Sequence, residues 1–128
     1  MTHSLISTFS HIKNGISKKK FSVSTPKTKL CAQFLNVLWD EGYILGYSLS
    51  QKNPKNFEIF LKYYKKNSVI KVLKSVSKPS LKIYCTIKEL WKFNYNLGNI
   101  FISTNKGILT INHCKKFNIG GEILCIIY

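Results

Sequence analysis

The sequence predicts an α+β fold made of two small modules, an N-terminal αβαββ module and a C-terminal module that is mostly β with a short helix. Apolar residues recur at helical spacing in the first part of the chain, whereas short β-rich runs separated by turn residues dominate the second. A polar stretch at 65–68 separates the two patterns. Hydrophobic residues make up 45% of the 128 residues, which is enough to build a core. We therefore expect one module at 1–66 and a β-rich module at 67–128.

The N-terminal module combines two amphipathic helices with three strands. Apolar residues recur every three or four positions from Leu5 to Ile16, which is typical of one face of a helix. Either Thr25 or Thr28 can cap the second helix, and a polar turn joins the last two strands as a hairpin. The predicted elements are, in order, a helix at 5–16, a strand at 18–24, a helix ending at 40–42, and strands at 43–50 and 57–63.

The C-terminal module consists mainly of short runs rich in β-branched and aromatic residues. Pro79 separates the first two runs, and a tight connection at 104–107 joins the next pair. The predicted elements are, in order, strands at 69–76 and 81–86, a helical turn at 87–91, strands at 100–103 and 108–110, a basic helix at 111–117 and a strand at 122–128.

The charge of the chain points to a polyanionic partner. All 20 basic residues are lysine, only five residues are acidic, and the net charge is +15 at pH 7. Few proteins without a polyanion partner carry such an excess. The lysines occur in clusters interleaved with aromatic residues such as Tyr63 and Tyr64, so phosphate contacts and base stacking are both available. For any single lysine, simple solubilisation is the better interpretation, but it does not account for a net charge of +15.

Enzymatic, metal-binding and membrane-spanning functions are not supported by the sequence. The four cysteines are scattered without a C-x-x-C pair, and we expect four reduced thiols and no bound metal. Neither a phosphate-binding glycine loop nor a spaced catalytic constellation is present, so we expect no catalysis, no cofactor and no small-molecule substrate. The apolar runs are far shorter than the roughly 20 residues that a membrane span needs.

The most distinctive local motif is the loop Ser103-Thr104-Asn105-Lys106-Gly107. It offers two hydroxyls, an amide and an ammonium group, and its glycine permits close approach of the backbone to a ligand. These groups suit a ribose 2′-hydroxyl, a base edge or a phosphate. An ordinary hairpin turn would have a similar composition.

Together with the later Gly120-Gly121-Glu122-Ile123, this loop makes the sequence recognisable. The chain resembles ribosomal protein eight of the small subunit, of the bacterial and organellar type, over essentially its whole length. Collinear stretches that match the family occur at 12–15, 29–30, 36–38, 41–44, 61–63, 76–84, 97–98, 103–110 and 120–125.

The resemblance implies a two-module fold that binds the central domain of small-subunit ribosomal RNA (rRNA) directly and supports subunit assembly and translation. Neighbouring small-subunit ribosomal proteins are the other implied partners. In the family the C-terminal module carries most of the specific RNA contact, and N-terminal basic residues meet backbone phosphates. The implied rRNA-binding residues are Ser103, Thr104, Asn105, Lys106, Gly107, Tyr84, Glu122, Lys82, Lys13, Asn14 and Lys29.

The chain departs from the family pattern in several places. Ser80 replaces a glycine after Pro79, Asn105 replaces the usual serine of the loop, and every family arginine has become lysine. Lysine lacks the bidentate guanidinium fork, so base discrimination has to come from hydroxyls, amides, stacking and shape. A rival interpretation from another class is a free polyanion-binding or RNA-chaperone module without specific readout.

The composition also indicates an A+T-rich genome, because lysine, asparagine and isoleucine are abundant and arginine is absent. We expect a mitochondrial ribosome, with a plastid or an A+T-rich bacterial cytoplasm as alternatives. Residues 1–39 contain no acidic residue and include Lys18, Lys19 and Lys20, as a transit peptide would. The helical face at 5–16 and the resemblance favour a structural N-terminus instead.

Overall fold

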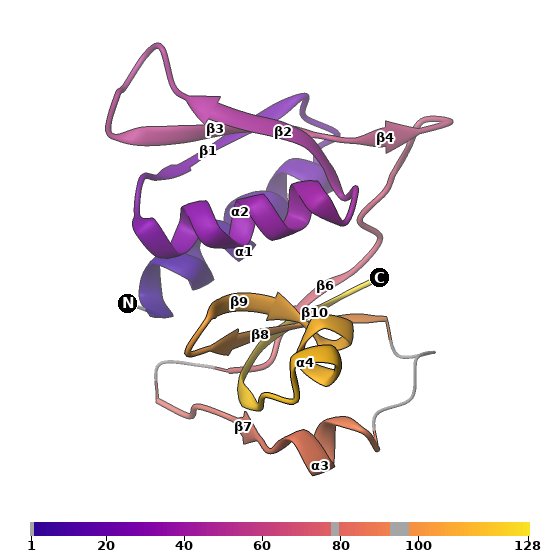
Figure 1. Ribbon diagram of the computed structural model, residues 1–128. Coiled ribbons are helices and arrows are strands. Elements are labelled where there is room, and N and C mark those ends of the chain that lie inside the picture. Colours follow the sequence, from indigo (N-terminus) through magenta and orange to yellow (C-terminus); the bar gives the residue numbers. More distant parts are fainter. Residues whose placement is uncertain (1, 78–79, 93–97) are drawn as a thin grey trace. The chain divides into compact units, whose positions relative to one another are not determined.

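The computed structural model describes residues 2–77, 80–92 and 98–128, with side chains described from Leu5 onward. The chain divides into two compact units, Met1–Lys71 and Val72–Tyr128 (Figure 1). This division lies five residues beyond the boundary at 66/67 expected from the sequence. The assignment of 1–66 and 67–128 as domains stays a prediction.

The N-terminal unit is a three-stranded antiparallel sheet with two helices on one face (Figure 1). The strands lie in the order β1-β3-β2, so β3 is central. The expected αβαββ order is confirmed. The elements are α1 (Thr2–Ser17), β1 (Ser22–Pro26), α2 (Lys29–Asp40), β2 (Ile44–Leu49) and β3 (Asn56–Leu61).

The core of this unit forms where the apolar faces of the two helices meet the sheet. Phe9 of α1 packs edge-on against Phe34 of α2, with ring centroids 5.0 Å apart. Every second residue of β3 is buried, as a half-covered strand requires. Thr28, rather than Thr25, caps α2, because its hydroxyl accepts a hydrogen bond of 3.1 Å from the backbone N–H of Cys31.

A small hairpin that the sequence analysis did not anticipate follows β3. It consists of β4 (Tyr63–Tyr64) and β5 (Asn67–Ser68), joined by Lys65 and Lys66. Both lysines have left-handed backbone angles, with φ of 49° and 68°. Two-residue hairpin turns need this conformation and normally use asparagine or glycine, so the lysine pair gave no turn signal.

The C-terminal unit is organised around its last strand, β10. The strands lie in the order β6-β10-β8-β9, and β7 also pairs with β10. A buried cluster that includes Ile100, Ile102 and Ile123 packs under α3 and α4, whose Leu90 and Cys114 join it. The elements are β6 (Leu73–Ser75), β7 (Tyr84–Cys85), α3 (Ile87–Leu90), β8 (Asn99–Thr104), β9 (Gly107–Thr110), α4 (Ile111–Phe117) and β10 (Gly121–Ile127).

The strands predicted at 69–76 and 81–86 are much shorter in the structure, because they share one edge of β10. β6 pairs with Cys125–Ile127, whereas β7 pairs with Gly121 and Glu122. Neither strand can extend without displacing the other from that edge. The buried Ser77 ties the junction together: its hydroxyl donates to the carbonyl of Ile123 (2.5 Å) and accepts from the N–H of Ile83 (3.1 Å). Pro79 lies outside the described residues.

The strand expected at 18–24 begins only at Ser22, because 18–20 form the turn that ends α1, where the Lys20 N–H donates to the Gly15 carbonyl (2.9 Å). The remaining expected elements agree with the structure. The helical turn, the β8–β9 hairpin and the basic helix lie where the sequence places them, and α4 has the predicted bounds. Within the described residues, no helix is long and apolar enough to cross a membrane.

Candidate functional site

Three of the implied RNA-binding residues form one row across the sheet of the C-terminal unit. Glu122 of β10 pairs with Tyr84 of β7 on one side and with Ser103 of β8 on the other. Directly paired residues of neighbouring strands project from the same face of a sheet. Tyr84 is 64% exposed, so its ring is available for stacking. Positions separated by up to 38 residues in sequence therefore form one surface.

The loop at 103–107 is the tight turn of the β8–β9 hairpin and begins at Ser103, whose partner on β9 is Ile108. Thr104 pairs with Gly107, and the Thr104 hydroxyl donates to the Gly107 carbonyl (2.8 Å) and accepts from the Lys106 N–H (3.2 Å). Gly107 has a φ of 105°, which a residue with a Cβ adopts only at a cost. The Thr104 side chain thus holds the turn closed, while Asn105 and Lys106 are exposed at its tip.

Glu122 has an unused acceptor at the centre of the row. Its Oε1 atom is buried and has no hydrogen-bond partner among the described residues. A buried carboxylate oxygen without a donor is unfavourable in the isolated protein. A ligand that brings a hydroxyl or amino hydrogen to this atom would relieve that penalty.

The two glycines before Glu122 let the surrounding backbones approach closely. A Cβ on Gly121 would collide with the carbonyl oxygen of Ser103, and a Cβ on Gly120 would collide with that of Cys85. The Gly-Gly pair therefore sets the spacing between β10 and the segments that carry Tyr84 and Ser103.

The lysines of the C-terminal unit differ in their exposure and in their contacts. Lys82 and Lys116 are exposed, and the Lys106 ammonium lies 5.0 Å from the ring centroid of Phe117. Lys115 is only 9% exposed, and its ammonium lies 5.1 Å from the ring centroid of Trp91. Lys115 therefore contributes to packing, which the basic character of the predicted helix does not reveal.

The candidates of the N-terminal unit are exposed, and one of them, Asn14, lines a groove. Asn14 lines a groove of about 380 Å³ between the end of α1 and β1, where His11, Lys18 and Lys20 also lie. Lys13 and Lys29 are exposed at the surface and do not line it.

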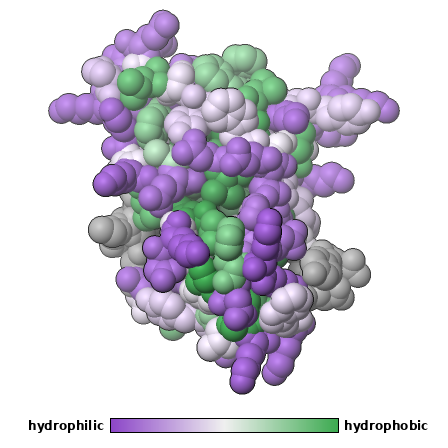
Figure 2. Space-filling view, viewed as in Figure 1, coloured by the Kyte–Doolittle hydropathy of each residue, from purple (hydrophilic) through white to green (hydrophobic). Residues whose placement is uncertain are grey.

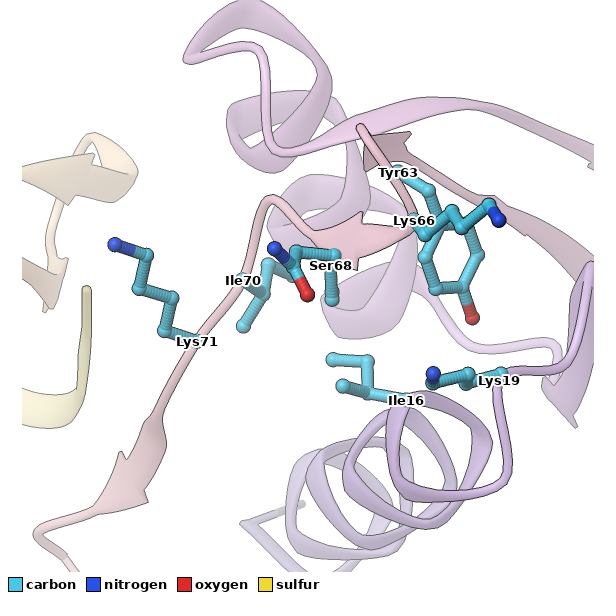
Figure 3. A pocket seen from close by; sticks show the side chains of 8 residues that line it. Ile16, Lys19, Tyr63, Lys66, Ser68, Ile70 and Lys71 are labelled. Atoms are coloured by element: carbon cyan, nitrogen blue, oxygen red, sulfur yellow. The ribbon is translucent and has the colours of Figure 1, made fainter.

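A second basic cavity in this unit was missed by the sequence analysis. It has a volume of about 370 Å³ and is lined by the end of α1, the β4–β5 hairpin and the segment that follows (Figure 3). Lys19, Lys66 and Lys71 contribute to its wall. The Lys65–Lys66 pair was the available signal, but its place in a turn was not apparent from the sequence.

The cysteines and histidines gather no metal site within the part of the chain that the structure describes. All four cysteines are reduced thiols, and Cys31, Cys114 and Cys125 are fully buried. His113 lies next to Cys114 in the sequence, but it is exposed, and its Nδ1 lies 2.9 Å from the Thr110 hydroxyl. Burial raises the pKa of the Cys114 thiol to about 11.

Hydrophilic side chains are prominent on the face of the molecule drawn in Figure 2. Figure 2 shows hydrophilic side chains projecting from much of the visible face, with hydrophobic surface between them. A surface of this kind suits a hydrated polyanion that also offers flat bases.

Comparison with known proteins agrees with these features. The family model for ribosomal protein S8 matches residues 4–128. Proteins named small ribosomal subunit protein uS8 are similar over the full chain: that of Rhizobium rhizogenes is 41% identical and that of Caulobacter vibrioides (strain NA1000) 42% identical. In each case 100% of this chain and 98% of the relative are covered. The chain therefore belongs to the ribosomal protein S8 family.

Proposed function

We propose that this protein is a structural constituent of the small ribosomal subunit that binds rRNA directly and supports subunit assembly and translation. The observation that carries the proposal is the row of Tyr84, Glu122 and Ser103, with the loop at 103–107 beginning at the Ser103 end of the row. Its family is structural, and the site described here contains acceptors, donors and an aromatic ring rather than a catalytic arrangement.

The row and the loop would provide specificity, since they offer groups that read bases and riboses. Tyr84 can stack on an unpaired base, and the Ser103 hydroxyl and the partly exposed Glu122 carboxylate can engage a 2′-hydroxyl or a base amino group. We assign the target to the central domain of the small-subunit rRNA, as the family resemblance implies. Asn105 and Lys106 would contact the same RNA segment from the tip of the turn.

The remaining exposed lysines would provide affinity and register by meeting phosphates. Lys82 lies near the row in the C-terminal unit, and Lys13, Asn14 and Lys29 serve the N-terminal unit. Phosphate contacts position a protein on RNA without carrying sequence information. Neighbouring small-subunit proteins complete the set of proposed partners.

We infer that the ribosome concerned is mitochondrial, because the chain lacks arginine and its composition indicates an A+T-rich genome. The relatives named above are bacterial, which accords with the alternative of an A+T-rich bacterial cytoplasm. A plastid is the third possibility. Locating the chain by immunodetection in purified organelles or in a bacterial lysate separates the three.

The rival is a free polyanion-binding module without specific readout. We expect the purified protein to bind a central-domain rRNA fragment, and unlabelled fragment of the same sequence to compete far better than bulk RNA at equal salt. In cells of the source organism, the protein should co-sediment with small subunits in a gradient. Equal competition by both RNAs, or absence from the subunit fractions, would contradict the ribosomal role.

A further inference from the structure

Residues 30–51 stand apart from the rest of the chain in their charge. The protein has 20 lysines in 128 residues, yet this 22-residue stretch, the longest such gap, contains none. It also carries Asp40 and Glu41, two of the five acidic residues of the protein. The stretch spans nearly all of α2 and the whole of β2 in the N-terminal unit.

Aromatic and apolar side chains are exposed in this same stretch. Trp39 is 53% exposed and Leu49 51% exposed. The rings of Trp39 and Tyr47 meet edge-on with centroids 6.3 Å apart, and the Tyr47 hydroxyl donates to Oδ1 of Asn36 (2.6 Å). Tyr47 is further held by Phe57, whose ring centroid is 5.2 Å away. We call the surface formed by Asn36, Trp39, Asp40, Tyr47 and Leu49 the Trp39 face.

The chemistry of the Trp39 face disfavours a phosphate backbone as its partner. The exposed carboxylate of Asp40 repels phosphates, and the five residues of the face include no lysine. The same carboxylate attracts lysine and arginine, and a cation also binds favourably over an exposed tryptophan ring. Exposed tryptophan and tyrosine are typical anchors of protein–protein contacts.

β2 adds a second feature that suits a protein partner. Within the described residues it is the edge strand of its sheet, since β3 is its only paired neighbour. Edge strands of proteins commonly carry lysine that discourages pairing with other chains, and β2 has none.

We propose that the Trp39 face docks a basic segment of a neighbouring small-subunit protein, one that carries lysine or arginine beside apolar side chains. The inference rests on the proposed ribosomal function, because it assumes that the chain lies within a particle. The proposal gives the two kinds of surface different partners. The lysine-rich surfaces bind rRNA, and the Trp39 face, which contains no lysine, binds protein.

A photocrosslinking experiment on assembled particles tests the proposal. The full chain, with a benzophenone amino acid at position 39, is reconstituted with small-subunit rRNA and the other small-subunit proteins, and the adduct is identified by mass spectrometry. We expect an adduct to a protein segment containing lysine or arginine. The control places the same reagent at position 21, where Phe21 is 70% exposed and follows Lys18, Lys19 and Lys20; there we expect an RNA adduct.

Charge variants show whether the carboxylates contribute. The double variant Asp40→Asn with Glu41→Gln should lower the yield of the position-39 adduct about threefold or more, the effect of removing modest ion pairs. Ser22→Lys with Ser24→Lys raises the net charge equally, but on β1 at the other edge of the sheet, where Ser24 pairs with Glu58 and the Ser22 hydroxyl donates to it. This control should leave the yield unchanged.

The outcomes separate failure of this proposal from failure of the ribosomal role. An RNA adduct at position 39, or no adduct in particles that contain the chain, overturns the docking proposal alone. If the chain does not enter the particles, as gel analysis before illumination would reveal, the ribosomal role fails and the docking proposal fails with it.

Discussion

At the scale of single residues, Ser103 and Thr104 are adjacent hydroxyls with different roles. The Thr104 hydroxyl is engaged inside the turn, whereas Ser103 belongs to the row with Glu122. We predict that Ser103→Ala lowers affinity for the cognate rRNA fragment by about 1–3 kcal/mol, the range for a lost buried hydrogen bond. Binding to non-cognate RNA and the salt dependence should not change. Filter binding at constant salt measures both, and an equal loss for the two RNAs would show that Ser103 does not confer specificity.

Thr104→Ser is the matched control for that variant. Serine retains the hydroxyl that bonds Gly107 and Lys106, so affinity should be nearly unchanged. Thr104→Ala should weaken cognate binding by loosening the turn.

Glu122→Gln should change the stability of the protein and its affinity for RNA in different ways. The substitution removes a charge from a carboxyl group whose Oε1 is buried without a partner, so the free energy of unfolding should rise or stay level. If the carboxylate accepts a hydrogen bond from RNA, affinity for the cognate fragment should fall by about 1–3 kcal/mol. Urea unfolding and filter binding measure the two quantities. Tighter cognate binding would indicate that Glu122 merely repels phosphates.

Cys114 should make stability fall at alkaline pH. Burial raises the pKa of its thiol from 9.0 to about 11, so the folded state keeps a proton that the unfolded state releases. This contribution is fully present below pH 9 and is lost as the pH rises from 9 toward 11. Urea midpoints at pH 8 and pH 10.5 should therefore differ more for the parent protein than for Cys114→Ala. An identical difference in both would refute the assignment to this thiol.

At the scale of elements, the Gly120–Gly121 pair governs how closely β10 approaches its neighbours. In Gly121→Ala, the new methyl group would press on the Ser103 carbonyl, and we expect a loss of about 1–3 kcal/mol in the free energy of unfolding, typical of overpacking. RNA affinity should fall too, because the spacing within the row changes. Gly42→Ala is the control: a Cβ on Gly42 would meet only the Lys62 ammonium, at an ordinary contact distance of 3.9 Å, so the φ of 79° is the main obstacle to alanine. Thermal unfolding that ranks Gly42→Ala as the more harmful change would contradict the steric account.

The elements that the sequence predicts correctly are those whose signal is local. The stripe of α1, the capped α2 and the β8–β9 hairpin each depend on residues close in sequence, and all three agree with the structure. The lengths of β6 and β7 depend instead on how one edge of β10 is shared, which no local pattern records. The β4–β5 hairpin was not predicted from the sequence because lysine is not a usual turn residue.

The candidate site, like the fold, could be predicted from the sequence only in part. Its residues could be named from family motifs, but their alignment in one row follows from strand register, which is a tertiary property. The unpartnered oxygen of Glu122 and the burial of Lys115 likewise depend on packing.

At the scale of the whole molecule, binding should depend steeply on salt. If about five to eight lysines meet phosphates, log K should fall against log salt with a slope of roughly −4 to −7, taking about 0.9 per contact. Lys106→Gln should make the slope less steep by about one unit if Lys106 meets a phosphate. Lys115→Gln should leave the slope nearly unchanged, since that side chain is buried against Trp91. Filter binding over a salt series gives the slopes, and a nearly flat series for the parent protein would exclude an electrostatic basis for affinity.

At three lysines with left-handed backbone angles, thermal stability and positive charge make opposite demands on the sequence. Lys19, Lys65 and Lys66 all have left-handed backbone angles, and Lys19 and Lys66 share a basic cavity. Glycine or asparagine would fit these angles with less strain, so a designer who optimises thermal tolerance would replace all three. Each replacement would remove one positive charge from a surface that we assign to RNA. At these positions, engineering for heat resistance and natural selection for ribosome assembly would favour opposite residues.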